Sequence, residues 1–172
     1  NGVRILDVDN NGFLDVLIGN EQTRTMRVWQ SGHQKWLDVK HDIQFTSGDA
    51  QHRLDHGIQI GQFTPQSTLS LLANHEKDQA IYEFADGNLR RSPLPTSLLD
   101  VSTSVDGVDN GVRLRDLDSD GFSEIIVAND ETQTILRNDR NGDWVAASSF
   151  PAPIVDADGR DNGVRFVDLD GD

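Results

Sequence analysis

The 172-residue chain repeats itself, and this internal repeat limits its possible folds more than any other feature. The segment NGVRILDVD, which begins at Asn1, recurs as NGVRLRDLD at Asn110 and as NGVRFVDLD at Asn162. A more divergent copy, HGIQIGQFT, begins at His56, so the intervals are 55, 54 and 52 residues. Repeats of this length are usually supersecondary units that bury their apolar faces by stacking on neighbouring copies.

The copies divide the chain into three full repeats and the first 11 residues of a fourth. The similarity continues beyond the opening segments, because residues 14–29 align without gaps to residues 69–84 and 123–138. The predicted boundaries are residues 1–55 for repeat 1, 56–109 for repeat 2, 110–161 for repeat 3 and 162–172 for the start of repeat 4.

Each repeat has the pattern of several short strands. In repeat 1 these are VRILDV, LDVLIG, RTMRVWQ and KWLDV, separated by turn-forming Asn, Asp, Gly and Ser. Four antiparallel strands in a unit of this length predict an all-β fold, a β-propeller with about three blades and the start of a fourth. A β-solenoid would have shorter repeats, and an immunoglobulin-like sandwich would not show this internal identity.

A cluster of acidic residues follows the first strand of repeat 1. Asp7, Asp9, Asn11 and Asp15 occupy positions 1, 3, 5 and 9 of a loop, with Gly12 at position 6. Oxygen-bearing side chains at alternate positions of a tight loop converge, and the carbonyl of the position-7 residue can add a further oxygen. Such a set suits Ca²⁺, which takes about 6–8 oxygen ligands, whereas Zn²⁺ favours His or Cys.

The same spacing occurs in repeat 3 and begins again in repeat 4. Repeat 3 has carboxylates at positions 1, 3, 5 and 9, and its fourth carboxylate predicts tighter binding than in repeat 1. The partial copy DLDGD contributes three further candidate ligands. These candidate residues are Asp116, Asp118, Asp120 and Glu124 in repeat 3, and Asp168, Asp170 and Asp172 in repeat 4.

An EF-hand and an ordinary turn are the alternatives to such a calcium loop. An EF-hand needs a Glu at position 12 between two helices, but Ile18 and Val127 occupy that position here, between predicted strands. Ordinary turns are also rich in Asp and Asn. The recurrence of the acids at one place in the repeat favours a cation, because carboxylates gathered without one repel each other.

Repeat 2 provides a control within the sequence. Its equivalent residues are Gln62, Thr64, Gln66 and Ser70, and Ser67 replaces the glycine. All carboxylates are therefore absent from this loop. We expect it to bind no calcium and to close through hydrogen bonds between neutral groups.

The loops DVDNNGFLDVLIGN and DLDSDGFSEIIVAND resemble the FG-GAP and VCBS repeats of integrin α subunits and many secreted bacterial proteins. The resemblance implies a propeller of about seven blades, with calcium in the loop between the first two strands of many blades. It implies calcium ligation by Asp7, Asp9, Asn11, Phe13 and Asp15, and by Asp116, Asp118, Asp120, Phe122 and Glu124. The phrase DNGVRFVDLDGD also resembles repeats in large secreted planctomycete proteins, some of which are joined to haem dehydrogenase domains.

Charge narrows the expected partners. The chain has 29 Asp and Glu against 15 Lys and Arg, a formal net charge of −14. Such a surface repels nucleic acid and anionic membranes. No apolar run approaches the length of a membrane span, so we expect no membrane insertion. We predict no nucleic-acid partner and a ligand that is a protein or a glycan.

The expected function is binding or adhesion by a calcium-stabilised, non-catalytic module outside the cell, at its surface or in the periplasm. The alternative is a propeller within a secreted enzyme, such as a polysaccharide lyase, a sugar dehydratase or a haem-linked dehydrogenase, whose catalytic residues lie mostly elsewhere. A third interpretation is a structural spacer in a large surface protein. Because three blades leave apolar faces open, we expect the remaining blades to come from the same longer chain or from another copy.

Overall fold

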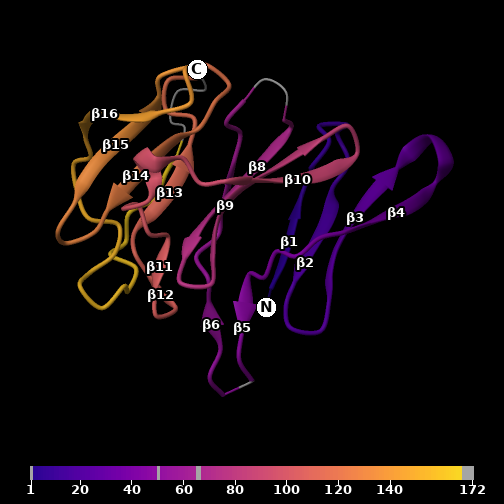
Figure 1. Cartoon of the computed structure of the whole chain (residues 1–172), viewed down its shortest axis with the longest axis horizontal. Helices are drawn as coiled ribbons and strands as arrows, with labels where there is room; N and C mark the ends of the chain where they lie inside the picture. The colour runs from indigo at the N-terminus through magenta and orange to yellow at the C-terminus, as the bar shows by residue number, and fades with distance from the viewer. Residues whose placement is uncertain (1, 50, 65–66, 168–172) are drawn as a thin grey trace.

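The computed structural model describes residues 2–49, 51–64 and 67–167, and this part of the chain is all-β (Figure 1). Three four-stranded antiparallel sheets, called blades 1 to 3, follow one another along the chain. Blade 1 comprises β1 (Val3–Leu6), β2 (Asp15–Gly19), β3 (Arg24–Gln30) and β4 (Lys35–Lys40). Blade 2 comprises β7 (Gln59–Gly61), β8 (Leu69–His75), β9 (Asp78–Ala85) and β10 (Asn88–Pro93). Blade 3 comprises β13 (Val112–Arg115), β14 (Glu124–Ala128), β15 (Gln133–Asn138) and β16 (Trp144–Ser149).

The blades have the strand order of propeller blades. In each sheet neighbouring strands in the chain are neighbours in space, so the sheet is a simple meander. In the view of Figure 1, the sheets succeed one another from blade 1 on the right to blade 3 on the left. The predicted propeller blades are therefore present in the described residues, which form three blades and no closed ring.

Two small hairpins connect the blades. The first consists of β5 (Thr46–Ser47) and β6 (Leu54–Asp55), and the second of β11 (Ser104–Val105) and β12 (Val108–Asp109). Two short 3-10 helices, η1 (Ser31–His33) and η2 (Thr96–Leu98), complete the described elements. None of the helices in the described part of the chain has the length and hydrophobicity needed to cross a bilayer.

The hydrophobic core is divided into layers between successive sheets. Side chains of blade 1, such as Leu17 and Met26, pack on Leu71 and Tyr82 of blade 2. A second layer joins Leu72 of blade 2 to blade 3, and a third lies between blade 3 and the beginning of repeat 4. Each buried strand therefore faces two layers, which explains its nearly continuous apolar sequence.

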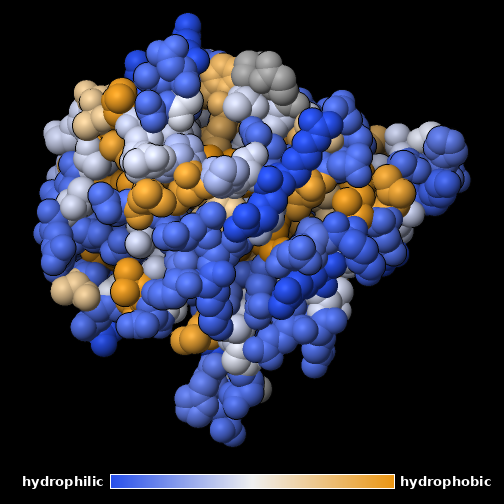
Figure 2. Space-filling model, viewed as in Figure 1, coloured by the Kyte–Doolittle hydropathy of each residue, from blue (hydrophilic) through white to orange (hydrophobic). Residues whose placement is uncertain are grey.

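Blade 1 has one face that lacks such a layer. The strand register places Val3 and Ile5 on the face that also carries Trp29 and Trp36. Ile5 is 65% exposed and Trp36 is 40% exposed. The corresponding face of blade 2, which includes Leu71, is buried against blade 1. Figure 2 shows hydrophobic areas on an otherwise largely hydrophilic surface.

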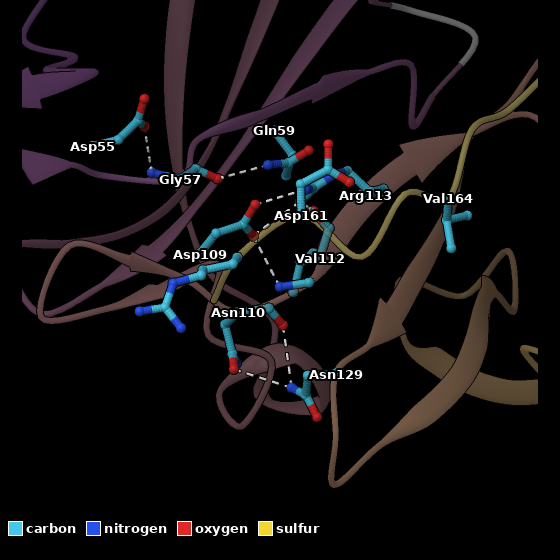
Figure 3. A network of polar contacts seen from close by, with 12 residues as sticks. Asp55, Gly57, Gln59, Asp109, Asn110, Val112, Arg113, Asn129, Asp161 and Val164 are labelled. Carbon is cyan, nitrogen blue, oxygen red and sulfur yellow. Dashed lines mark hydrogen bonds and ion pairs between the residues drawn. The ribbon is translucent and has the colours of Figure 1, made fainter. Parts of the chain in front are cut away.

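A polar clasp precedes β13 and recurs at the start of repeat 4 (Figure 3). Asp109 accepts a hydrogen bond from the backbone of Gly111 at 2.9 Å and binds the Arg113 guanidinium at 2.9 and 2.6 Å. Asp161 makes the same contacts with Gly163 and Arg165, and the Arg165 hydrogen bond lowers the pKa of Asp161 to about 2. Gly111 has a φ of 71°, a conformation that glycine adopts without strain.

Two histidines are buried together where repeat 2 meets its neighbours. The rings of His56 and His75 stack with centroids 4.6 Å apart, and the Nε2 atom of each is buried without a hydrogen-bond partner among the described residues. Burial is the main cause that lowers the pKa of both imidazoles below the ordinary 6.5. Lys77 lowers both values further, whereas Glu76 opposes the shift.

This pair predicts a loss of stability in mild acid. The unfolded chain binds more protons than the folded chain below pH 6.5, so the free energy of unfolding falls as pH drops from about 7 to 5. Urea unfolding across this range measures the slope. His56→Phe keeps a stacking ring but removes a titrating group, so it should flatten the slope, while His33→Gln at an exposed site should not. An equally steep slope in His56→Phe would contradict the prediction.

Candidate metal centre

Loop 1 (residues 7–15) connects β1 to β2, and its first carboxylate organises the turn. The two oxygens of Asp7 accept backbone hydrogen bonds from Asn11 at 3.0 Å and Gly12 at 2.7 Å. Asn10 and Gly12 have φ values of 57° and 87°, which tighten the loop. The Asn11 side chain in turn accepts the N–H of Phe13 at 2.9 Å. The side chains at positions 1 and 5 are thus held in place by backbone donors.

Loop 3 (residues 116–124) connects β13 to β14 and has the same internal bonds. Asp116 accepts backbone hydrogen bonds from Asp120 at 3.2 Å and Gly121 at 2.9 Å. Asp120 accepts the N–H of Phe122 at 2.9 Å, and Ser119 and Gly121 have φ values of 58° and 88°. The two loops therefore adopt one conformation although their sequences differ. Calcium ligation by the Phe13 and Phe122 carbonyls stays a prediction.

The position-9 carboxylates anchor both loops to the sheets. Asp15 is fully buried, and its oxygens accept hydrogen bonds from the backbone of Val8 at 2.9 Å and Trp29 at 2.6 Å. Glu124 is also buried and accepts the N–H of Leu117 at 2.8 Å. A hydrogen-bonded carboxylate tolerates burial far better than an isolated one. These hydrogen bonds fix the position of each loop relative to the strands of its blade.

The carboxylates of loop 1 converge as the spacing predicts. Oxygen atoms of Asp7, Asp9 and Asp15 all lie within 4.8 Å of one another. One Asp9 oxygen, Oδ1, is buried and has no hydrogen-bond partner among the described residues. Burial and the nearby carboxylates of Asp15 and Asp7 raise the pKa of Asp9. The donor set is oxygen alone, so these residues fit a hard divalent cation such as Ca²⁺.

Loop 3 brings together Asp116, Asp118 and Asp120, whose oxygen atoms also lie within 4.8 Å of one another. This loop also has a basic neighbour. The Arg137 guanidinium lies 2.9 Å from Asp118 and 3.8 Å from Glu124. Burial raises the pKa of Glu124, and Asp118 adds to the rise while Arg137 opposes it. Sequence reasoning did not identify Arg137, which lies outside the loop on β15.

Loop 2 (residues 62–70) has the same place in blade 2 but a different chemistry. Ser70 accepts the N–H of Phe63 at 3.1 Å, as Asp15 accepts that of Val8 in loop 1. The hydroxyls of Thr64, Ser67 and Ser70 lie within hydrogen-bond distance of one another along the loop. The described part of loop 2 therefore closes through hydroxyl groups, as its neutral sequence predicts.

The candidate ligands Asp168, Asp170 and Asp172 lie outside the described residues. Their assignment stays a prediction from the spacing in repeat 4.

Comparison with known proteins found a family match in the last part of the chain. Residues 116–172, about a third of the chain, match the family described as the FG-GAP-like repeat. No curated protein and no solved structure matched the chain. The matching stretch begins at the first carboxylate of loop 3 and includes β14, β15 and β16. The chain thus carries an FG-GAP-like repeat at residues 116–172.

Proposed function

We propose that this chain is a calcium-binding β-propeller segment in which the cation stabilises the loops between the first two strands of blades 1 and 3. The observation that carries the proposal is loop 1, where three carboxylates converge and one buried Asp9 oxygen has no hydrogen-bond partner in the described part of the chain. The same loop conformation in blade 3 supports it. Bound Ca²⁺ would supply the positive charge that these oxygens otherwise lack.

The chain's own residues position the ligands for such a cation. Backbone N–H groups hold Asp7 and Asn11, and buried hydrogen bonds hold Asp15. The ligands are therefore placed before the cation arrives, which reduces the ordering cost of binding. A cation bound only by the folded loop stabilises the fold by mass action.

The setting that we propose is a larger secreted or surface protein. FG-GAP repeats typically occur in extracellular or surface proteins, where calcium is abundant enough for weak sites. The open face of blade 1, with Ile5 and Trp36, supports further blades from the same chain or another copy. The module then presents its loops to a protein or a glycan rather than performing catalysis.

Calorimetric titration with CaCl₂ tests the proposal. The unsubstituted chain is expected to bind calcium at two loops. Asp9→Asn removes one charge from loop 1 and should abolish or strongly weaken one of the two binding events. Asp42→Asn, which makes the same charge change at a site outside the loops, should keep both. Absence of binding, or two unchanged events in Asp9→Asn, would contradict the proposal.

A further inference from the structure

In every blade, one residue of the third strand lies opposite position 9 of the loop between the first two strands. In blade 2, Glu83 of β9 pairs with Ser70, the position-9 residue of loop 2. In blade 1, Val16 pairs with Arg27, so the next residue of β3, Val28, lies opposite Asp15. In blade 3, Ile125 pairs with Leu136, so the next residue of β15, Arg137, lies opposite Glu124. We call this the facing position.

The facing position supplies a different partner to each loop. In blade 2, Glu83 accepts a hydrogen bond from the Thr64 hydroxyl at 3.0 Å. Thr64 occupies position 3 of its loop, as Asp9 and Asp118 do in theirs. In blade 2 the carboxylate at the facing position therefore accepts a hydrogen bond from a neutral hydroxyl of the loop.

Blade 1 supplies no charge at this position. Val28 is 3% exposed and belongs to the core between blades 1 and 2. The position-3 carboxylate, Asp9, is left with its buried oxygen unpaired among the described residues. The oxygen atoms of loop 1 suit a cation from solution, which would pair with this Asp9 oxygen.

Blade 3 supplies a positive charge of its own. Arg137 reaches the position-3 carboxylate of Asp118 and approaches the position-9 carboxylate of Glu124. Both acids are predicted calcium ligands. The guanidinium thus already pairs with two of the groups that a bound cation would need.

We propose that Arg137 is a built-in counterion that competes with calcium for loop 3. This inference rests on the proposed function, because it concerns the affinity of a proposed calcium site. Loop 3 is then closed by Arg137 at low calcium, and calcium binds when it displaces the guanidinium from Asp118 and Glu124. In the described residues no arginine or lysine takes this place at loop 1, where Val28 occupies the facing position, so loop 1 depends on the cation. The four carboxylates of loop 3 alone predict tighter binding, and Arg137 opposes that effect.

The expected size of the effect follows from the exposure of the ion pair. The Arg137 side chain is 55% exposed and that of Asp118 is 38% exposed, so solvent screens their attraction. Glu124 is 5% exposed, which strengthens its share of the interaction. We therefore expect loss of Arg137 to tighten calcium binding at loop 3 about two- to fivefold.

The test measures calcium binding by calorimetry in chains that carry Asp9→Asn, so that loop 3 dominates the signal. Arg137→Val reproduces the residue of blade 1 and is expected to lower the Kd by about two- to fivefold. Arg137→Gln, which keeps a long polar side chain, should do the same if the valine variant folds poorly. Arg140 and Arg137 line one surface pocket beside loop 3, so Arg140→Asn removes an equal charge nearby and should change the Kd less than twofold. An unchanged or raised Kd in both Arg137 variants would overturn the inference.

A second readout separates this inference from the proposed function. In chelator, loss of Arg137 leaves the loop 3 carboxylates without their counterion, so the Tm of Arg137→Val should fall. In saturating calcium the difference from the unsubstituted chain should shrink. Calcium binding at loop 3 with the same Kd in the presence and absence of Arg137 would refute the inference and leave the proposed function standing. Absence of binding in every variant, together with an unchanged Tm, would refute both.

Discussion

Asp15→Ala is expected to lower the free energy of unfolding by about 3 kcal/mol, even in chelator. Asp15 is fully buried, and its two oxygens accept the backbone N–H groups of Val8 and Trp29. Alanine would leave both donors buried and unpaired, and each such group costs about 1–3 kcal/mol. The effect arises from loop anchoring and is separate from any loss of a metal ligand.

Urea unfolding of Asp15→Ala and of a neighbouring control measures this cost. Leu14→Ala changes the preceding residue, which is 64% exposed, and should shift the free energy of unfolding by less than about 0.5 kcal/mol. In calcium the Asp15→Ala deficit should grow, because the variant also loses a ligand. A deficit below about 1 kcal/mol in chelator would contradict the anchoring role of Asp15.

The strands of the blades were predictable from the sequence. Apolar and β-branched runs separated by turn residues placed four strands in repeat 1, and the structure has β1 to β4 at nearly the same residues. The prediction succeeded because alternation and turn chemistry are local properties. The Asn-Gly turns were also predictable, since Gly111 and Gly163 have the positive φ that such turns need.

The hairpins between blades were not predicted. β5, β6, β11 and β12 each contain only two residues, which is too short for a periodic pattern. Contacts between repeats help to position them, as the approach of β6 to β12 illustrates. The stacked pair of His56 and His75 was missed for the same reason, because its members come from separate segments.

The convergence of the acidic side chains was predictable from the sequence, but the residues around them were not. The spacing of Asp7, Asp9 and Asp15 led directly to their convergence. Arg137 was missed, although the gap-free alignment already places it in one column with Val28 and Glu83. What the alignment lacks is the strand register, which brings this column opposite position 9 of each loop.

Removing calcium is expected to have the largest effect on the chain. A ligand at a hundred times its Kd stabilises the folded state by about 2.7 kcal/mol per site. For two such sites in a chain of this size, the Tm should rise by about 10–20 °C in calcium relative to chelator. The reason is that the cation relieves the repulsion between the carboxylates that the folded loops bring together, most strongly in loop 1, where no arginine takes its place in the described residues.

Thermal unfolding of the unsubstituted chain in calcium and in chelator is the most direct test of the central claim. Magnesium at the same concentration serves as the control, because its stricter octahedral geometry and retained waters suit these loops poorly. The account predicts a Tm that rises by about 10–20 °C in calcium, with a much smaller rise in magnesium. Equal Tm values in calcium and chelator would mean that loops 1 and 3 are ordinary turns and that the calcium-binding function is wrong.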